Sequence, residues 1–86
     1  MFMPKYNLIE IFIEQNCRAC DEVLAVIAAF ADQVSVAVTV FDRESDPTIF
    51  RERRVLISPA TFVNGRLAFY GSFSVDALRN HIIHAG

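Results

Sequence analysis

The spacing of the apolar residues changes at a pair of cysteines, Cys17 and Cys20, and this change constrains the fold more than any other feature of the chain. Before the pair, residues 7–14 (NLIEIFIE) form an Ile-rich apolar run, which is typical of a strand buried on both faces. From Arg18 to Phe30 the apolar residues instead recur at helical spacing, without Gly or Pro. We therefore predict a central strand followed directly by an amphipathic helix, with the cysteines at their junction.

A second strand and a short helix are predicted next. Residues 33–41 (QVSVAVTVF) place valine at every second position, and this two-residue period in β-branched sequence indicates a strand. Asp46 suits an N-cap, and Pro47 suits the first position of a short helix that continues through residues 48–53. A strand-helix-strand start favours two parallel strands joined by a right-handed crossover.

The C-terminal half predicts a hairpin and a last helix. Asn64 and Gly65 stand between two apolar runs, which is the strongest short-range signal for a β-hairpin. Ser74 can cap a helix that includes Ile82 and runs to Gly86. The predicted order is βαβαββα, a single α/β domain over residues 1–86, whose four-stranded mixed sheet carries helices on both faces.

Composition limits the class of partner. The chain has 86 residues, 53% of them hydrophobic, which is enough for one compact domain with a core of its own. Its formal net charge of −2 argues against nucleic acid or an anionic membrane as the main partner, since both bind basic surfaces. Pro4 and Lys5 interrupt any secretory apolar core, and the longest apolar run, residues 23–31, is too short for a membrane span. We expect a cytoplasmic monomer.

The two cysteines are open to several interpretations. A purely structural disulfide between Cys17 and Cys20 would close a very short loop, so it would constrain little of the unfolded chain. A zinc site is suggested by a second pair of ligands, His81 and His84, but the 60 residues that separate Cys20 from His81 (21–80) exceed the spacing of local zinc motifs. A metal cluster shared between two subunits is a further alternative.

Redox chemistry has a positive physical argument. Cys17 is predicted at a helix N-terminus, where unpaired backbone N–H groups and the helix dipole lower the pKa of a thiol, and Arg18 adds a positive charge. Cys20 lies one turn further on the same helix face, within reach of a mixed disulfide formed at Cys17. Three acids oppose the thiolate, and the sequence leaves the balance open: Glu14, Asp21 and Glu22. The spacing predicts Cys17 as the nucleophile and Cys20 as the resolving thiol.

With the dithiol at a helix start and the stretch ISPATFVNGR at residues 57–66, the chain resembles the thioredoxin/glutaredoxin superfamily over nearly its whole length. The chain is small and lacks a leading β-α unit, and in both respects it is similar to glutaredoxins and short thioredoxin-like proteins. The resemblance implies a thioredoxin-like fold and a thiol–disulfide oxidoreductase. It also implies that Pro59 is a cis-proline facing the dithiol and that the backbone of Ser58 pairs with an extended substrate. Ser58, Pro59 and Arg18 are thus the expected substrate-binding residues.

The chain also departs from the family pattern. Arg18-Ala19 separates the cysteines where thioredoxins usually carry Gly-Pro, and Ile11 stands where they keep a buried acid. The features that hold glutathione in glutaredoxins are only partly present, with Ser58-Pro59 in place of Thr-Val-Pro. The expected partners are therefore a disulfide-containing protein and either a thiol reductase or glutathione, and no cofactor is expected.

A different class of function stays open beside this one. The same fold also suits a non-catalytic interaction module with vestigial or metal-bound cysteines, because a fold does not determine a function. A local basic cluster at Arg51, Arg53 and Arg54 has two interpretations as well. It is either a solvated helix face or a docking patch for an acidic partner.

Overall fold

The computed structural model describes residues 7–82. Its elements are β1 (Asn7–Ile13), α1 (Arg18–Ala31), β2 (Val36–Asp42), α2 (Pro47–Glu52), β3 (Ala60–Val63), β4 (Arg66–Tyr70) and α3 (Val75–Arg79). The predicted order βαβαββα is confirmed. None of the helices in this part of the chain is long and apolar enough to cross a membrane.

The sheet is mixed, as predicted, and its strand order is β2-β1-β3-β4. β1 runs parallel to β2 and antiparallel to β3, and the hairpin adds β4 at the other edge. Consecutive residues of β1, Ile11 and Phe12, are both 0% exposed, so this strand is buried on both faces. β2 lies at an edge of the sheet. Val38 and Val40 of this strand remain exposed, although valine at every second position is typical of a strand with one buried face.

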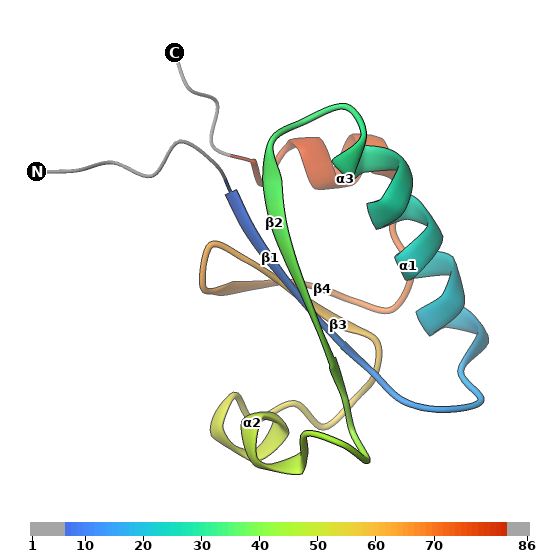
Figure 1. The fold of residues 1–86 in the computed structure, drawn as a ribbon, viewed down its shortest axis with the longest axis vertical. Coiled ribbons are helices and arrows are strands. Elements are labelled where there is room, and N and C mark those ends of the chain that lie inside the picture. The colour runs from blue at the N-terminus through green and yellow to red at the C-terminus, as the bar shows by residue number, and fades with distance from the viewer. Residues whose placement is uncertain (1–6, 83–86) are drawn as a thin grey trace, which may run out of the picture.

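Two separate apolar clusters cover the two faces of the sheet. On one face, α1 and α3 pack together against the strands, and this cluster includes Ile11, Phe30 and Leu78. On the opposite face, the short α2 contributes Phe50, which meets the ring of Phe12 edge-on at 5.0 Å between centroids. Figure 1 shows α1 and α3 on one side and α2 beside the far end of β2. The prediction of helices on both faces is confirmed.

The hairpin turns at Asn64 and Gly65, where the sequence predicts it. Both residues have positive φ, 52° and 84°, as a two-residue type I′ turn requires. Asn64 does more than turn the chain. Its Oδ1 accepts the N–H of Leu8 at 2.9 Å, and its Nδ2 donates to Oδ1 of Asn7 at 2.8 Å. The tip of the hairpin is therefore tied to the beginning of β1.

Two details of the helices differ from the predictions. Asp46 occupies the N-cap of α2, but its side chain accepts the N–H of Asp42 at 3.1 Å instead of capping the helix. The last helix ends at Arg79, because the chain then tightens into hydrogen bonds that join Ile82 to Arg79 and His81 to Leu78. Ile82 is still buried, whereas the predicted continuation over residues 83–86 lies outside the described residues.

One buried hydroxyl gives a stability prediction. Thr61 of β3 is 0% exposed, and its Oγ1 has no hydrogen-bond partner among the described residues. Valine has almost the same shape and no polar atom to bury, so Thr61→Val should raise the free energy of unfolding by about 1 kcal/mol. Urea denaturation of the oxidised protein measures this change. Thr61→Ser, which keeps the hydroxyl and removes the methyl group, should lower stability, and the opposite ranking would show that the hydroxyl is paired.

Candidate active site

Cys17 lies at the junction of strand and helix that the spacing predicts. It is the N-cap of α1, with an extended backbone (φ −122°), and its Sγ accepts the backbone N–H of Cys20 at 3.0 Å. The N–H of Asp21 bonds to the carbonyl oxygen of Cys17 at 3.2 Å, which closes the first turn. A sulfur at an N-cap is thus held beside the amide donors that stabilise negative charge.

The two sulfurs are joined in a Cys17–Cys20 disulfide, but they differ in accessibility. Cys20 is 1% exposed and belongs to the buried residues of α1, whereas Cys17 is only partly buried. A thiol from solvent can therefore approach Cys17 and is kept from Cys20 by the surrounding structure. The roles of Cys17 as nucleophile and Cys20 as resolving thiol stay a prediction.

The segment before β3 reaches the same end of the sheet. Ala60 pairs with Phe12 near the end of β1, so the preceding Ser58 and Pro59 lie close to the segment that leads to Cys17. The Ser58–Pro59 peptide bond is cis, and Pro59 is fully buried. The carbonyl oxygen of Pro59 accepts the N–H of Gly71 at 2.8 Å. By contrast, the backbone N–H and C=O of Ser58 make no hydrogen bond within residues 7–82.

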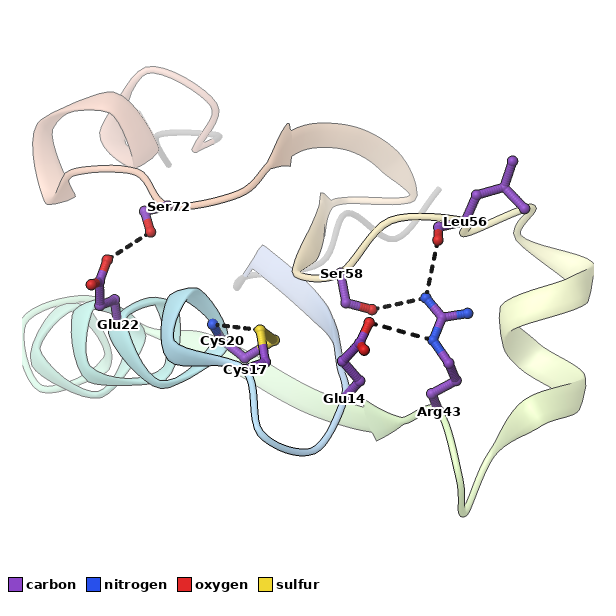
Figure 2. The surroundings of a disulfide bond; sticks show 8 residues. All are labelled: Glu14, Cys17, Cys20, Glu22, Arg43, Leu56, Ser58 and Ser72. Atoms are coloured by element: carbon purple, nitrogen blue, oxygen red, sulfur yellow. Dashed lines mark hydrogen bonds and ion pairs between the residues drawn. A yellow bond between two sulfur atoms is a disulfide. The ribbon is translucent and has the colours of Figure 1, made fainter.

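Arg43 connects the two segments that form the site. Its Nη2 donates to Oγ of Ser58 at 3.0 Å and to the carbonyl oxygen of Leu56 at 3.3 Å, and its Nε lies 3.6 Å from Oε1 of Glu14 (Figure 2). The backbone N–H of Arg43 also bonds to the carbonyl oxygen of Ile13 at 3.0 Å. This residue therefore joins the loop before β3 to the segment between β1 and the dithiol.

Sequence reasoning missed Arg43, although a signal for it exists. The residue directly follows β2, and β2 runs parallel to β1, whose carboxyl end leads into the dithiol. Because the carboxyl ends of parallel strands meet at one edge of a sheet, a charged residue at this position belongs to the same site.

The charges around Cys17 are partly offset. Arg18 is exposed and makes no ion pair within the described part of the chain. Of the acids that oppose a thiolate, Glu14 pairs with Arg43, and Glu22 accepts a hydrogen bond from Oγ of Ser72 at 2.8 Å. Asp21 lies in the first turn of α1. The ion pair with Arg43 offsets the charge of Glu14, whereas the neutral hydroxyl of Ser72 leaves the charge of Glu22 in place.

Among the residues considered for metal binding, those that the structure describes, Cys17, Cys20 and His81, do not form a metal site. His81 is exposed and meets the ring of Phe69 edge-on at 4.9 Å, and His84 lies outside the described residues. Between residues 7 and 82, no group of three or more His, Cys, Asp or Glu side chains is placed to hold a metal ion.

The fold and the site together define a class of protein. Residues 7–83 match the model of a family described as the thioredoxin domain, and the chain belongs to this family. The resemblance that the sequence suggests is therefore confirmed, and a dithiol in this family supports a redox type of function. Among curated proteins, none matches the sequence significantly.

Solved structures show the same fold. Thioredoxin-2 of the malaria parasite, described as a component of its protein secretion machinery, superimposes with a TM-score of 0.75 at 14% identity, over 90% of this chain and 81% of that one. Chloroplast thioredoxin z gives 0.77 at 17% identity, over 87% and 74%. A further malarial protein gives 0.76 at 12% identity, over 92% and 100%. At these identities the similarity establishes the thioredoxin-like fold alone.

Proposed function

We propose that the protein is a thiol–disulfide oxidoreductase that acts through Cys17 and Cys20. The observation that supports this most is the unequal burial of the two sulfurs, with the accessible Cys17 at the N-cap of α1 and the buried Cys20 one turn away. A disulfide needed only for stability would gain nothing from an accessible sulfur beside helix amides, because amide donors favour the thiolate.

The reaction consists of two exchanges. The Cys17 thiolate attacks one sulfur of the substrate disulfide, a new S–S bond forms, and the other substrate sulfur leaves as a thiolate that takes up a proton. Cys20, as its thiolate, then attacks the Cys17 sulfur and releases the second substrate thiol. The substrate gains two electrons, and the Cys17–Cys20 disulfide forms. A thiol reductase or glutathione, as the reductant, returns the protein to the dithiol.

The loop before β3 is proposed to position the substrate. The unused backbone N–H and C=O of Ser58 can pair with an extended segment beside Cys17, in the manner of an added strand. Leu56 and Ile57, which precede Ser58, are 85% and 60% exposed and offer apolar contacts. These features favour a disulfide-containing protein as substrate. We also propose a reducing compartment such as the cytoplasm as the place of action, because thiols are kept reduced there and Cys17 is then available for exchange.

A redox titration tests the proposed function. The protein is equilibrated in buffers of stepped glutathione potential, quenched with acid, alkylated and weighed intact. We expect a single two-electron transition between dithiol and disulfide, at a potential within roughly −120 to −270 mV. A dithiol that never oxidises over this span, or a disulfide that never reduces, would exclude the function. Cys20→Ser serves as the control, because it has no internal partner and must lack the transition.

The rate of exchange should depend on pH in a defined direction. The helix amides favour the Cys17 thiolate, so we expect the apparent pKa of the reduced protein to lie below the free-cysteine value of about 8.5. The rate with a small disulfide should rise with pH and level off above this pKa, because only the thiolate attacks. Stopped-flow measurements of this rate at on the order of ten pH values between about 5 and 10 determine the apparent pKa. Free cysteine, measured in the same way, is the reference. A midpoint at or above that of free cysteine would contradict the expectation.

A further inference from the structure

A pocket of about 520 Å³ lies between α2 and the segment that leads to Ser58. Three arginines line it: Arg43, Arg51 and Arg54. Its apolar wall is formed by Pro47, Phe50, Val55 and Leu56. No acidic side chain is among the lining residues. The pocket is therefore positively charged, although the net charge of the chain is −2.

The arginines of this region differ in whether they already have an ion-pair partner. Arg43 is paired with Glu14. Arg51 has only a long contact of 3.4 Å from its Nη2 to Oγ1 of Thr48, and Arg54 makes no ion pair within residues 7–82. Neighbouring Arg53 instead points to the sheet and donates to Glu10 from both terminal guanidinium nitrogens, Nη1 and Nη2, at 2.9 and 2.8 Å. The basic cluster of the sequence thus divides, and two uncommitted cations face the pocket.

The turn after α2 holds one of these cations in an unusual position. The N–H of Val55 bonds to the carbonyl oxygen of Phe50 at 2.9 Å, and the N–H of Arg54 bonds to that of Arg51 at 3.1 Å, which together form a Schellman motif. Arg54 is its left-handed residue, with φ of 57°, where glycine or asparagine is usual. The chain keeps a long cationic side chain at a position where glycine costs less, which points to a use for that side chain.

The pocket adjoins the loop that carries Ser58, because Arg43 lines the pocket and also bonds Ser58. Leu56, which lines it, is 85% exposed, and its carbonyl oxygen accepts from the same Arg43 that bonds Ser58. Figure 2 shows Leu56, Arg43 and Ser58 together on one side of the disulfide. A polypeptide that pairs with the backbone of Ser58 has a direct path to this pocket.

We propose that the pocket binds an acidic segment of the substrate protein, close in sequence to the disulfide that is exchanged. Carboxylates of the segment pair with Arg51 and Arg54, since a guanidinium holds a carboxylate in two parallel hydrogen bonds. An apolar side chain between them packs against Pro47 and Leu56, the exposed apolar residues of the pocket, a contact that a mineral anion lacks. The inference rests on the proposed function, because it names the feature that selects a substrate for the dithiol.

Binding without chemistry is the first test. The oxidised protein, labelled with ¹⁵N, is titrated with a cysteine-free peptide that carries several glutamates around one leucine, and with the matched glutamine peptide. We expect amide shifts centred on residues 43–56 and an affinity for the acidic peptide on the order of tenfold higher. The double variant Arg51→Gln/Arg54→Gln should remove this preference, whereas Arg66→Gln, an exposed arginine outside the pocket, should keep it. Added salt should weaken the binding.

Several results would overturn the inference. They are equal affinity for both peptides, shifts away from residues 43–56, a preference that survives in the double variant, and tighter binding of inorganic phosphate at the same residues. Slowed diffusion of the protein alone, with the same amides affected, would identify a second copy of the chain as the occupant. The exchange rate with a disulfide peptide is measured separately. Exchange without acidic binding would refute only the docking site. Acidic binding without exchange would refute the proposed function, and the acidic segment would then not belong to an exchange substrate.

Discussion

Replacement of Cys17 by serine is expected to lower the rate of thiol–disulfide exchange by on the order of 10³-fold or more, because the hydroxyl is not ionised at neutral pH and cannot replace the thiolate as nucleophile. The remaining Cys20 is 1% exposed, so a substrate disulfide cannot reach it without local opening of α1. The measurement is the second-order rate constant with a fluorescence-quenched disulfide peptide under single-turnover conditions.

The matched variant is Cys20→Ser, which keeps the accessible thiol and removes the resolving one. It should form the first mixed disulfide at a rate within about tenfold of the wild type, because the amide donors of α1 still favour the Cys17 thiolate. It should then fail to release product. If the two serine variants were equally slow, or if Cys17→Ser reacted faster, the assignment of the nucleophile would be wrong.

Replacement of Arg53 by methionine should lower the free energy of unfolding by about 2–3 kcal/mol, the largest stability effect that we predict. Glu10 lies on the α2 face of the central strand, and its side chain is 8% exposed, against 32% for Arg53. The hydrogen bonds that Arg53 donates to the Glu10 carboxylate raise the pKa of Arg53 above its usual value, so Arg53 stays a cation. Without Arg53, the Glu10 carboxylate is buried and unpaired. Urea denaturation of the oxidised protein measures the loss.

Replacement of the partner residue, Glu10, should lower the free energy of unfolding by less than replacement of Arg53. This difference between the two variants makes the prediction specific. In the wild-type protein, the guanidinium of Arg53 lies 5.3 Å from the centroid of the Phe62 ring. In Glu10→Leu, Arg53 can keep this contact and turn its charge toward solvent. We therefore expect the free energy of unfolding to fall by about 1 kcal/mol or less. The double variant Glu10→Leu/Arg53→Met should recover most of the stability of the wild type. Equal losses in both single variants would show that burial does not set the cost.

The parts of the site that the sequence predicts are those set by local rules. The change of apolar period places Cys17 at the beginning of α1, and helix geometry then fixes Cys20 one turn away. The hairpin follows from Asn64 and Gly65 for the same reason, because its turn needs positive φ at two adjacent residues. Both predictions depend on neighbours in sequence and on no tertiary contact.

The parts that the sequence does not reveal depend on contacts between distant segments. Arg43 joins Glu14 to Ser58 only because β1, β2 and the loop before β3 end at one edge of the sheet. Likewise, Arg53 and Arg54 are adjacent in sequence but serve opposite purposes, since the turn after α2 directs one to the sheet and leaves the other at the pocket. Composition alone treats both as members of one basic cluster.

The central claim is that Cys17 is the nucleophile of a working dithiol, and a trapping measurement tests it most directly. Reduced Cys20→Ser protein is mixed with a defined disulfide peptide, quenched with acid and weighed intact, and the modified cysteine is located by peptide mapping. We predict one stable adduct, at Cys17, that is released by added thiol, while Cys17→Ser protein treated in the same way carries none. An adduct at Cys20 in the Cys17→Ser protein, formed as fast as the one at Cys17, would contradict the account.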